Sequence, residues 1–294
     1  QANGQEITGV EVFKNVTTHL YGRVSAMPGV EGSGERLRLT FSEDSPAVLE
    51  FRYAISFVSQ EQARINFDRE LKGVSFAELT RRGEDAWSKV INRITVNGGT
   101  EAWKRSFYTA LYRCYERPVN ISESESYFSG FDNKIHVDAR PFYVDDWTWD
   151  TYLAHHPLRM ILHPTMEADM LQSYVRMYQQ SGWMPTFPVI YGDHACMNGF
   201  HSSIVFLDAY RKGIRNYSVD SAFAGMLKNG DQATMVPWRN GPRCELDHFY
   251  QAHGFFPALQ PGEKESYNLV DSFEKRQAVA VTLGHSYDDW AVAE

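Results

Sequence analysis

The chain has 294 residues, 43% of them hydrophobic, which is enough to bury one large core or two modest ones. Its formal net charge of −8 argues against nucleic acid or an anionic membrane surface as a partner. The sequence has no run of about 18 apolar residues, so no membrane-spanning helix is predicted. Its three cysteines have neither the spacing of a zinc site nor the even number of a disulfide framework.

The first part of the chain is predicted to be β structure. Apolar and polar residues alternate from Leu37 to Phe41 and again from Leu49 to Phe57, a period of two that is typical of a half-buried antiparallel strand. Two or three such strands are too few to close a β sandwich. The chain is therefore expected to begin inside a β domain.

From about residue 75 the apolar pattern changes to that of helices. Ser75 followed by Glu78 is typical of a capping box, and a second helix is predicted from about Glu101 to Glu116, before Pro118. Further helices are predicted over residues 167–180, 201–212, 219–228 and 272–292. Short turns between successive helices favour antiparallel hairpins, stacked as a bundle or an α/α toroid.

The segment from Tyr143 to Tyr152 combines carboxylates with tryptophans. Asp150 is suited to accept hydrogen bonds from two sugar hydroxyls while Trp147 or Trp149 covers an apolar face of the ring. The alternative is that Asp150 caps the following helix and that both tryptophans belong to the core. The segment alone favours neither interpretation.

The segment from Gly192 to His201 is a polar connection of the kind that often carries a site. Asp193 and His194 are a candidate acid–base pair, and Cys196 is a candidate nucleophile beside His201. No nucleophile-elbow or papain-like pattern surrounds Cys196, so a small core residue is the commoner role for it. The other histidines lack the spacing of a histidine metal site.

The segment from Val281 to Trp290 is predicted to be helical, with Gly284 in its interior. Glycine inside a helix costs about 1 kcal/mol relative to alanine. A packing or functional reason is therefore expected at position 284.

These three segments together resemble glycoside hydrolase family 92, the calcium-dependent inverting exo-α-mannosidases. The resemblance covers roughly residues 100–294 and is carried by landmarks in a fixed order. They are the run from Phe107 to Tyr112, Trp149-Asp150-Thr151 with His156-Pro157, Gly182-Trp183-Met184-Pro185, the run from Cys196 to His201, Asp208-Ala209-Tyr210 with Lys212-Gly213-Ile214, and Tyr287-Asp288-Asp289-Trp290.

The resemblance implies an α+β multidomain fold, in which a β sandwich is followed by a helical linker and an (α/α)6 barrel, with the site at their junction. Residues 1–74 are then expected to be the C-terminal part of the sandwich, residues 75–142 the linker, and residues 143–294 the N-terminal part of the catalytic barrel. Members of the family are more than twice as long as this chain. The chain is therefore expected to be an incomplete catalytic unit.

The resemblance also implies that Asp150 binds mannose hydroxyls and that the loop around Cys196 lines the sugar pocket. The residues assigned to substrate binding are Trp149, Asp150, Asp193, His194, Cys196, Met197, His201 and Ser286. A catalytic Ca2+ is implied, with its ligands and the general base expected downstream of Glu294. The implied partners are mannose-containing glycans or mannosyl phosphodiesters, and the implied location is secreted or periplasmic.

The chain departs from the family pattern at Gly284. The family motif is T-L-E-Y-A-Y-D-D-W, whose glutamate is the general acid; this chain keeps six of the nine positions but has glycine in place of the acid. An alkoxide whose conjugate acid resembles water, with a pKa of ~15.7, leaves poorly without a proton. A phosphate with a second pKa of ~6 leaves without help. The gap of roughly 10 pKa units corresponds to ~13 kcal/mol.

We therefore interpret the chain as part of an enzyme that releases mannose from mannose-1-phospho-6-mannose diesters by inversion. His285 and Ser286, beside the vacant acid position, are then expected to contact the phosphate, unless His285 is only a packed or solvated replacement for tyrosine. Two other hypotheses stay open. One is an ordinary exo-α-1,2-mannosidase in which His285 or a displaced carboxylate acts as the acid, and the other is a mannose-binding relative without catalysis.

Overall fold

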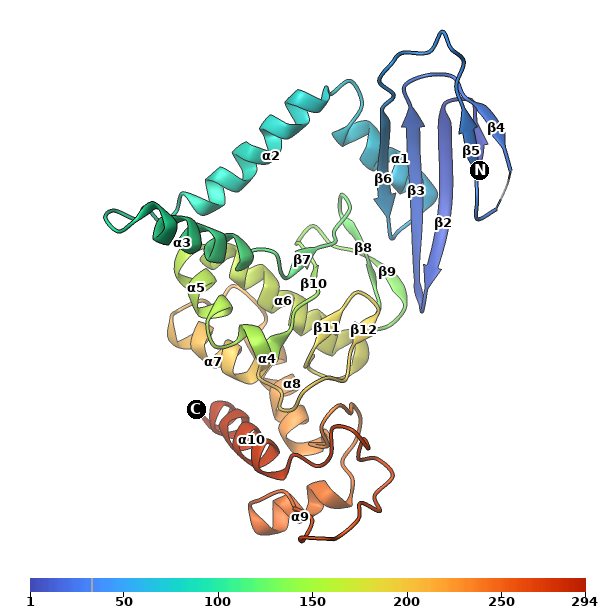
Figure 1. Cartoon of the computed structure of the whole chain (residues 1–294). Helices are drawn as coiled ribbons and strands as arrows, with labels where there is room; N and C mark the ends of the chain where they lie inside the picture. Colours follow the sequence, from blue (N-terminus) through green and yellow to red (C-terminus); the bar gives the residue numbers. More distant parts are fainter. Residues whose placement is uncertain (33) are drawn as a thin grey trace. The chain divides into compact units, whose positions relative to one another are not determined.

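The structure is a computed structural model that describes residues 1–32 and 34–294. These residues divide into two compact units (Figure 1). Unit 1 contains Gln1–Tyr112, Ser122–Phe128 and Asn133–Ala139, and unit 2 contains Arg113–Ile121, Ser129–Asp132 and Arg140–Glu294. The chain is a mixture of α and β structure, as predicted, while the division into sandwich, linker and barrel stays a prediction.

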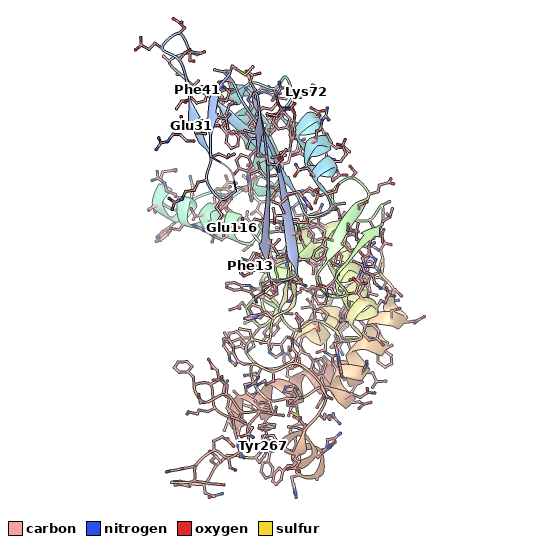
Figure 2. All side chains as sticks on the ribbon, turned by 90° about the vertical axis from the view of Figure 1, so that its right-hand side faces the viewer. Phe13, Glu31, Phe41, Lys72, Glu116 and Tyr267 are labelled. Carbon is pink, nitrogen blue, oxygen red and sulfur yellow. The ribbon has the colours of Figure 1, made fainter. Side chains whose placement is uncertain are left out.

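Unit 1 is built on an antiparallel sheet in the order β1-β2-β3-β6. Its strands are β1 (Ala2–Asn3), β2 (Glu6–Phe13), β3 (Val16–Val24) and β6 (Phe51–Ser56). A separate pair is formed by β4 (Gly29–Glu31) and β5 (Arg38–Thr40). The alternating residues predicted two of these strands, β5 and β6. The hairpin of β2 and β3, whose end is marked by Phe13 in Figure 2, was missed.

One face of this sheet is covered by α1 (Gln60–Glu70), which packs on β3 and β6. Tyr21 of β3 packs there against Ala63 and Phe67 of the helix. Side chains on β6 that alternate with the covered ones, Phe51 and Tyr53 among them, are exposed. The period of two predicts the strand correctly, but its apolar side is the one left exposed, while Ala54 lies on the side that packs against α1.

Two long helices complete unit 1. α2 (Phe76–Ile91) begins where the capping signature predicts, because the Ser75 hydroxyl accepts a hydrogen bond from the Glu78 amide at 3.2 Å. α3 (Glu101–Arg113) ends slightly earlier than predicted, ahead of Pro118. The rings of Trp87 and Tyr112 lie 4.4 Å apart and pack the two helices together.

Unit 2 is helical with short strands at its connections. Its helices are α4 (Thr148–Thr151), α5 (His155–Leu162), α6 (Pro164–Ser181), α7 (Ser202–Arg211), α8 (Val219–Gln232), α9 (Glu245–His253) and α10 (Ala278–Ala293). Its short strands pair as β7 (Val119–Asn120) with β10 (Tyr143–Val144) and β11 (Pro188–Val189) with β12 (Gly192–Asp193). The pair of β8 (Ser126–Ser129) and β9 (Lys134–Val137) belongs to unit 1 except for Ser129. Within the described residues, none of the helices is long and apolar enough to cross a membrane.

Helix α6 provides much of the core of unit 2, since nine of its 18 residues are buried. It packs on α5 and α8, while α7 contacts α5, α8 and α10. Pro164 stands at its first turn, and Gly182 ends it in a left-handed conformation with φ of 83°. The sequence predicted this helix because its apolar residues follow one helical face.

The last helix starts later than predicted. Residues around Asp271 form a turn instead, because the Asp271 carboxylate accepts hydrogen bonds from the backbone amides of Phe273 and Glu274. The Arg276 guanidinium pairs with Glu265 and fixes the end of this turn. Helix α10 therefore begins only at Ala278, and position 284 lies in its interior, as predicted.

Candidate functional site

Helix α4 is a single turn that presents Trp149 and Asp150 to solvent. Trp149 is 42% exposed, and Asp150 is also exposed. No hydrogen bond or ion pair of the Asp150 side chain joins it to any residue that the structure describes. Neither α4 nor α5 has a side-chain cap, so the alternative role of Asp150 as a helix cap has no hydrogen bond to support it. The carboxylate is available to a ligand.

Trp147 has a structural role next to this turn. Its ring is stacked on Phe187 with centroids 5.4 Å apart, and the Arg117 guanidinium lies 3.8 Å from its centroid. Trp149 makes no comparable ring contact among the described residues. Trp149 is therefore the better candidate for the sugar-stacking role that the sequence assigned to either tryptophan.

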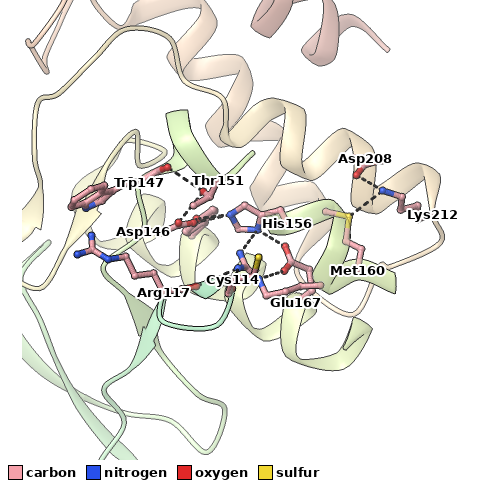
Figure 3. A network of polar contacts seen from close by, with 12 residues as sticks. Cys114, Arg117, Asp146, Trp147, Thr151, His156, Met160, Glu167, Asp208 and Lys212 are labelled. Atoms are coloured by element: carbon pink, nitrogen blue, oxygen red, sulfur yellow. Dashed lines mark hydrogen bonds and ion pairs between the residues drawn. The ribbon is translucent and has the colours of Figure 1, made fainter. Parts of the chain in front are cut away.

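A buried cluster of polar side chains lies beneath α4 (Figure 3). The Asp146 carboxylate accepts hydrogen bonds from the Thr151 hydroxyl at 2.9 Å and from the Tyr174 hydroxyl. His156 lies between two carboxylates, with Nε2 2.7 Å from Asp146 Oδ2 and Nδ1 2.5 Å from Glu167 Oε1. The cluster therefore connects the segment before α4 with α5 and α6.

Arg159 of α5 completes this cluster. Its Nε donates to Glu167 at 3.2 Å, and its NH1 donates to the backbone carbonyls of Cys114 and Arg117 at 3.1 and 3.2 Å. The side chains of Arg159, Glu167 and His156 are completely buried. A buried charge is tolerated when it is paired in this way.

The charges of the cluster balance when His156 carries a proton. Burial by itself lowers the pKa of His156, but the carboxylates of Glu167 and Asp146 outweigh it and raise that pKa to about 9. Burial likewise works against ionised Asp146, yet the neighbouring His156 charge brings the pKa of Asp146 below its ordinary value. At neutral pH the two carboxylates thus face two cations, His156 and Arg159.

The connection from β11 to α7 is organised by Asp193. Its carboxylate accepts hydrogen bonds from the backbone amides of Thr186 and Phe187 and from the Asn240 side chain. Burial raises the pKa of Asp193, an effect that these hydrogen bonds reduce. No hydrogen bond in the described chain joins Asp193 to His194, which is exposed. Asp193 therefore shapes the loop, and the geometry does not favour the predicted acid–base pair.

Asp288 of α10 anchors the other end of this connection. Its buried carboxylate accepts hydrogen bonds from the Phe200 amide at 2.8 Å, from Nδ1 of His201 at 2.8 Å and from the Ser203 hydroxyl at 3.1 Å. Gly199 has φ of +80°, and a Cβ there would lie 2.7 Å from His201 Cε1 and 2.8 Å from Asp288 Oδ2. The glycine of the Cys196–His201 landmark is thus required by its surroundings.

Gly284 faces this same loop from α10. A Cβ at position 284 would lie 3.1 Å from Asn198 Oδ1 and 3.8 Å from His201 Cε1. His201 in turn packs on the ring of Tyr152, at the end of α4, with centroids 4.5 Å apart. A chain of contacts therefore runs from the vacant acid position through His201 to the helix that carries Asp150.

His285 and Ser286 differ in their surroundings. His285 is buried near Phe200, with ring centroids 5.9 Å apart. Burial is the main cause that lowers the pKa of His285 to about 4, so the ring is neutral at neutral pH. Ser286 is exposed, and its hydroxyl donates to the Thr282 carbonyl and contacts the Tyr250 hydroxyl at 3.3 Å.

Cys196 lies where two carboxylates influence it. Burial is the largest cause that raises the pKa of its thiol, and the charges of Asp150 and Glu274 raise it further. A thiol with a raised pKa is protonated at neutral pH and is a weak nucleophile. The structure therefore gives no support to a nucleophilic Cys196, but it shows that Asp150 and Glu274 are both near this loop.

Glu274 is connected to the vacant acid position by two amides. Gln277 Nε2 donates to Glu274 Oε2 at 3.2 Å, and Asn198 Nδ2 donates to Gln277 Oε1 at 3.3 Å. The Asn198 oxygen then faces Gly284. Glu274 is thus a carboxylate connected through Gln277 and Asn198 to the place where the sequence motif lacks one.

A cavity of about 270 Å³ lies beside the loop from Gly192 to Phe200. Of the residues predicted to form the site, Asp193, Cys196, Met197 and His285 line it. Trp149, Asp150, His194, His201 and Ser286 are not part of its wall. Gly284 does not line the cavity either. The predicted residues outside the cavity therefore lie on α4 (Trp149, Asp150), on α10 (Gly284, Ser286) and in the connection from β12 to α7 (His194, His201).

The implied calcium has no site in this part of the protein. Within residues 1–32 and 34–294, no three His, Cys, Asp or Glu side chains come together as a metal site. The described residues therefore do not form a cluster that fits a resident cation.

Sequence reasoning did not assign roles to several residues that organise the site. Asp146 and Asp288 belong to the segments Tyr143–Tyr152 and Val281–Trp290, which the sequence analysis singles out. Each has an adjacent aspartate, and no sequence pattern distinguishes a buried carboxylate from an exposed one. Glu167 belongs to a predicted helix, where a charged residue is expected to face solvent. Glu274 was placed in a helix that begins only four residues later.

Comparison with known proteins identifies the family. Residues 62–294 match the model of the glycosyl hydrolase family 92 catalytic domain. The chain belongs to glycoside hydrolase family 92. Among solved structures, it is similar to a family 92 inverting mannosidase from Bacteroides thetaiotaomicron VPI-5482, with 26% identity and a TM-score of 0.82 over 99% of this chain and 40% of that one.

Two further proteins are similar to this chain. A family 92 α-mannosidase from Bacteroides thetaiotaomicron shares the fold, with 22% identity and a TM-score of 0.81 over 100% of this chain and 40% of that one. A protein of Arthroderma benhamiae described as an uncharacterized secreted glycosidase is 21% identical over 88% of this chain and 29% of its own length. The chain thus spans about 40% of the length of the solved family 92 structures that it matches.

Proposed function

We propose that this chain is part of a secreted or periplasmic glycoside hydrolase that releases α-linked mannose with inversion and uses Ca2+ bound outside residues 1–294. Membership of family 92 and the similarity to an inverting mannosidase support the reaction class. The exposed, unpaired carboxylate of Asp150 beside Trp149 supports a sugar-binding role for α4. The similarity to a secreted glycosidase supports the location.

The preferred substrate is a mannosyl phosphodiester, in which phosphate is the leaving group. The observation that carries this proposal is the position of Gly284, which faces the Asn198–His201 loop from the interior of α10 without any side chain. An inverting glycosidase that cleaves a sugar–sugar bond needs an acid on the leaving-group side. A phosphate leaves without a proton donor, so the glycine does not impair its departure.

The neutral state of His285 bears on this proposal. With a pKa lowered to about 4 by burial, His285 holds no proton to donate as a cation at neutral pH. It therefore does not replace the missing glutamate as a general acid under those conditions. If His285 contacts the phosphate, it does so as a neutral N–H donor.

A second candidate function is an ordinary exo-α-mannosidase with a displaced acid, and Glu274 is the observation that favours it. Glu274 acts electrostatically on Cys196 together with Asp150, and two amide hydrogen bonds connect it to Asn198 beside Gly284. In this mechanism Glu274 would have to reach the glycosidic oxygen.

The experiment that separates the candidates compares mannose release from mannose-1-phospho-6-mannose and from α-1,2-mannobiose. We expect faster turnover of the phosphodiester and little effect of Glu274→Gln on it. Gly284→Glu should raise hydrolysis of the disaccharide, more so when combined with Asn198→Ala, because a Cβ at position 284 lies only 3.1 Å from the Asn198 oxygen.

Faster turnover of the disaccharide by the unmodified protein would reject the phosphate as leaving group. If Glu274→Gln then abolished that activity, the second candidate would hold. In a protein that also includes the region downstream of Glu294, binding of mannose without turnover of either substrate would instead identify a relative that has lost catalysis.

A further inference from the structure

We propose that His156 is a positioning residue for the candidate sugar site: it ties Asp146, at the start of α4, to Glu167 of α6 and so fixes the helix that presents Asp150. This inference rests on the proposed function, because it takes Asp150 as the mannose contact. His156 itself is completely buried and does not reach solvent.

Helix α4 depends on such an anchor because it is too short to be stable alone. It has four residues and no side-chain cap, whereas isolated helices shorter than about 12–15 residues are marginal in water. Asp146 compensates for this by accepting the hydrogen bond of Thr151, the last residue of the turn. The Asp146 backbone amide also donates to the Pro188 carbonyl at 2.9 Å. Asp146 therefore holds the last residue of α4 with its side chain and fixes the segment before α4 with its backbone.

The anchor extends through His156 to two other segments of unit 2. His156 bonds Asp146 with one ring nitrogen and Glu167 with the other. Glu167 is held by Arg159, which also donates to the backbone carbonyls of Cys114 and Arg117.

The Arg117 side chain connects Arg159 back to the segment before α4. Its guanidinium lies over the Trp147 ring, immediately before α4. The contacts thus form a closed circuit around the turn that carries Asp150. Loss of one member should loosen α4 more than the rest of unit 2.

Both ring nitrogens of His156 face carboxylate oxygens, so both must carry a proton for the circuit to hold. The titratable and charged groups around His156 are Asp146, Glu167, Tyr174, Arg159 and the neighbouring His155. Loss of the His156 proton leaves two buried carboxylates facing a single cation. We therefore expect the anchor to weaken as the pH rises above about 6.5 and its contribution to be lost by about pH 9.

The test uses hydrogen exchange of the α4 amides in the whole chain, with rates corrected for the intrinsic effect of pH. In His156→Gln, the protection of the Asp150, Thr151 and Tyr152 amides at pH 7 should fall at least about tenfold relative to the rest of unit 2, a loss on the scale of one broken buried contact. The matched control is Leu171→Ala, a buried truncation on α6 outside the circuit. It should lower protection throughout unit 2 without singling out α4.

The unmodified protein gives the same test without a substitution. Protection of α4 should fall as the pH rises from about 6.5 to about 9, and His156→Gln should abolish this decline. Equal protection of α4 in the unmodified protein and in His156→Gln, or no decline over this pH range, would overturn the inference.

Binding of methyl α-mannopyranoside, measured by calorimetry, connects α4 with the sugar. We expect His156→Gln to raise the Kd at least about tenfold, since displacement of a contact group by about 1 Å can cost up to 10²-fold, and Leu171→Ala to change it little. A loosened α4 with unchanged sugar affinity would contradict the positioning role. If no variant and not even the unmodified chain bound the sugar while α4 still depended on His156, the proposed role of Asp150 would fail and the anchoring of α4 would stand.

Discussion

Among single residues, Gly199 shows most directly how the Cys196–His201 loop is constrained. Its φ of +80° is close to the +81° of Gly213, so both positions disfavour a side chain through the backbone alone. A Cβ at Gly199 would also clash with His201 and Asp288, whereas one at Gly213 would meet no atom within 4 Å. A comparison of alanine substitutions at Gly199 and Gly213 therefore separates the cost of backbone strain from the cost of steric clashes.

We expect Gly213→Ala to lower the free energy of unfolding by about 1–2 kcal/mol, the cost of a left-handed alanine. Gly199→Ala should lower it by about 1–3 kcal/mol more, because overpacking is added to that strain. Urea unfolding of both variants measures the difference. Equal losses would show that the loop moves away from the new methyl group at no cost.

The sequence indicated some of these residues and not others. Gly284 drew attention because glycine is unfavourable inside a helix, and Asp150 because a carboxylate stands between tryptophan and threonine in a polar segment. Asp146 and Glu274 gave no such signal, since their roles depend on burial and on partners that are distant in the sequence. Those partners, such as Glu167 for the cluster around Asp146, are brought close only by the packing of helices.

At the scale of elements, one carboxylate of α10 determines where α7 begins. Asp288 accepts hydrogen bonds from the Phe200 amide, the His201 ring and the Ser203 hydroxyl, all within 3.1 Å. Its neighbour Asp289 is exposed and accepts only the Tyr250 hydroxyl at 3.3 Å among the described residues. Of the two adjacent aspartates, Asp288 therefore holds the start of α7, while Asp289 makes one surface contact.

Asp288→Asn should lower the free energy of unfolding by about 3 kcal/mol. One carboxylate oxygen, which accepts a hydrogen bond, would be replaced by an amide N–H₂ group that faces a buried donor. Asp289→Asn, on the same helix, should cost less than about 1 kcal/mol. Urea unfolding again provides the comparison. A small loss for Asp288→Asn would mean that α7 and the loop before it do not depend on this carboxylate.

Elements with a strong internal pattern were predictable, while those determined by tertiary contacts were not. The apolar face of α6 and the alternation of β6 are visible in the sequence. The β2–β3 hairpin was missed although its strands alternate in part, because its turn at Lys14 and Asn15 contains no glycine. Lys14 nevertheless adopts φ of +54° there. Short elements such as α4 have too few residues to show any period.

At the scale of the whole molecule, two buried histidines should give stability a maximum near pH 6.5. The pKa of His156 is raised from 6.5 to about 9, so the folded state holds a proton that the unfolded state releases above pH 6.5. The pKa of His285 is lowered from 6.5 to about 4, so unfolding takes up a proton below pH 6.5. Stability should therefore decline from about pH 6.5 toward pH 9 and also toward pH 4.

The free energy of unfolding should fall by on the order of 3 kcal/mol on the alkaline side and by a similar amount on the acid side, since each unit of pKa difference corresponds to ~1.4 kcal/mol. The measurement is the free energy of urea unfolding between pH 4 and pH 10. His156→Gln should flatten the alkaline limb and leave the acid limb, and His285→Gln should do the reverse between pH 6.5 and pH 4. A variant that shifted both limbs equally would contradict the assignment.

The proposed release of mannose from a phosphodiester depends on the absence of a proton donor at Gly284, which is proposed to face a mannose bound by Asp150. The most direct measurement is the rate of mannose release from a series of aryl α-mannosides whose leaving groups differ in pKa. Without an acid, the rate should fall steeply as the leaving-group pKa rises, and Gly284→Glu with Asn198→Ala should make that dependence shallow. A shallow dependence in the unmodified protein would show that a proton donor is already present and would contradict the account.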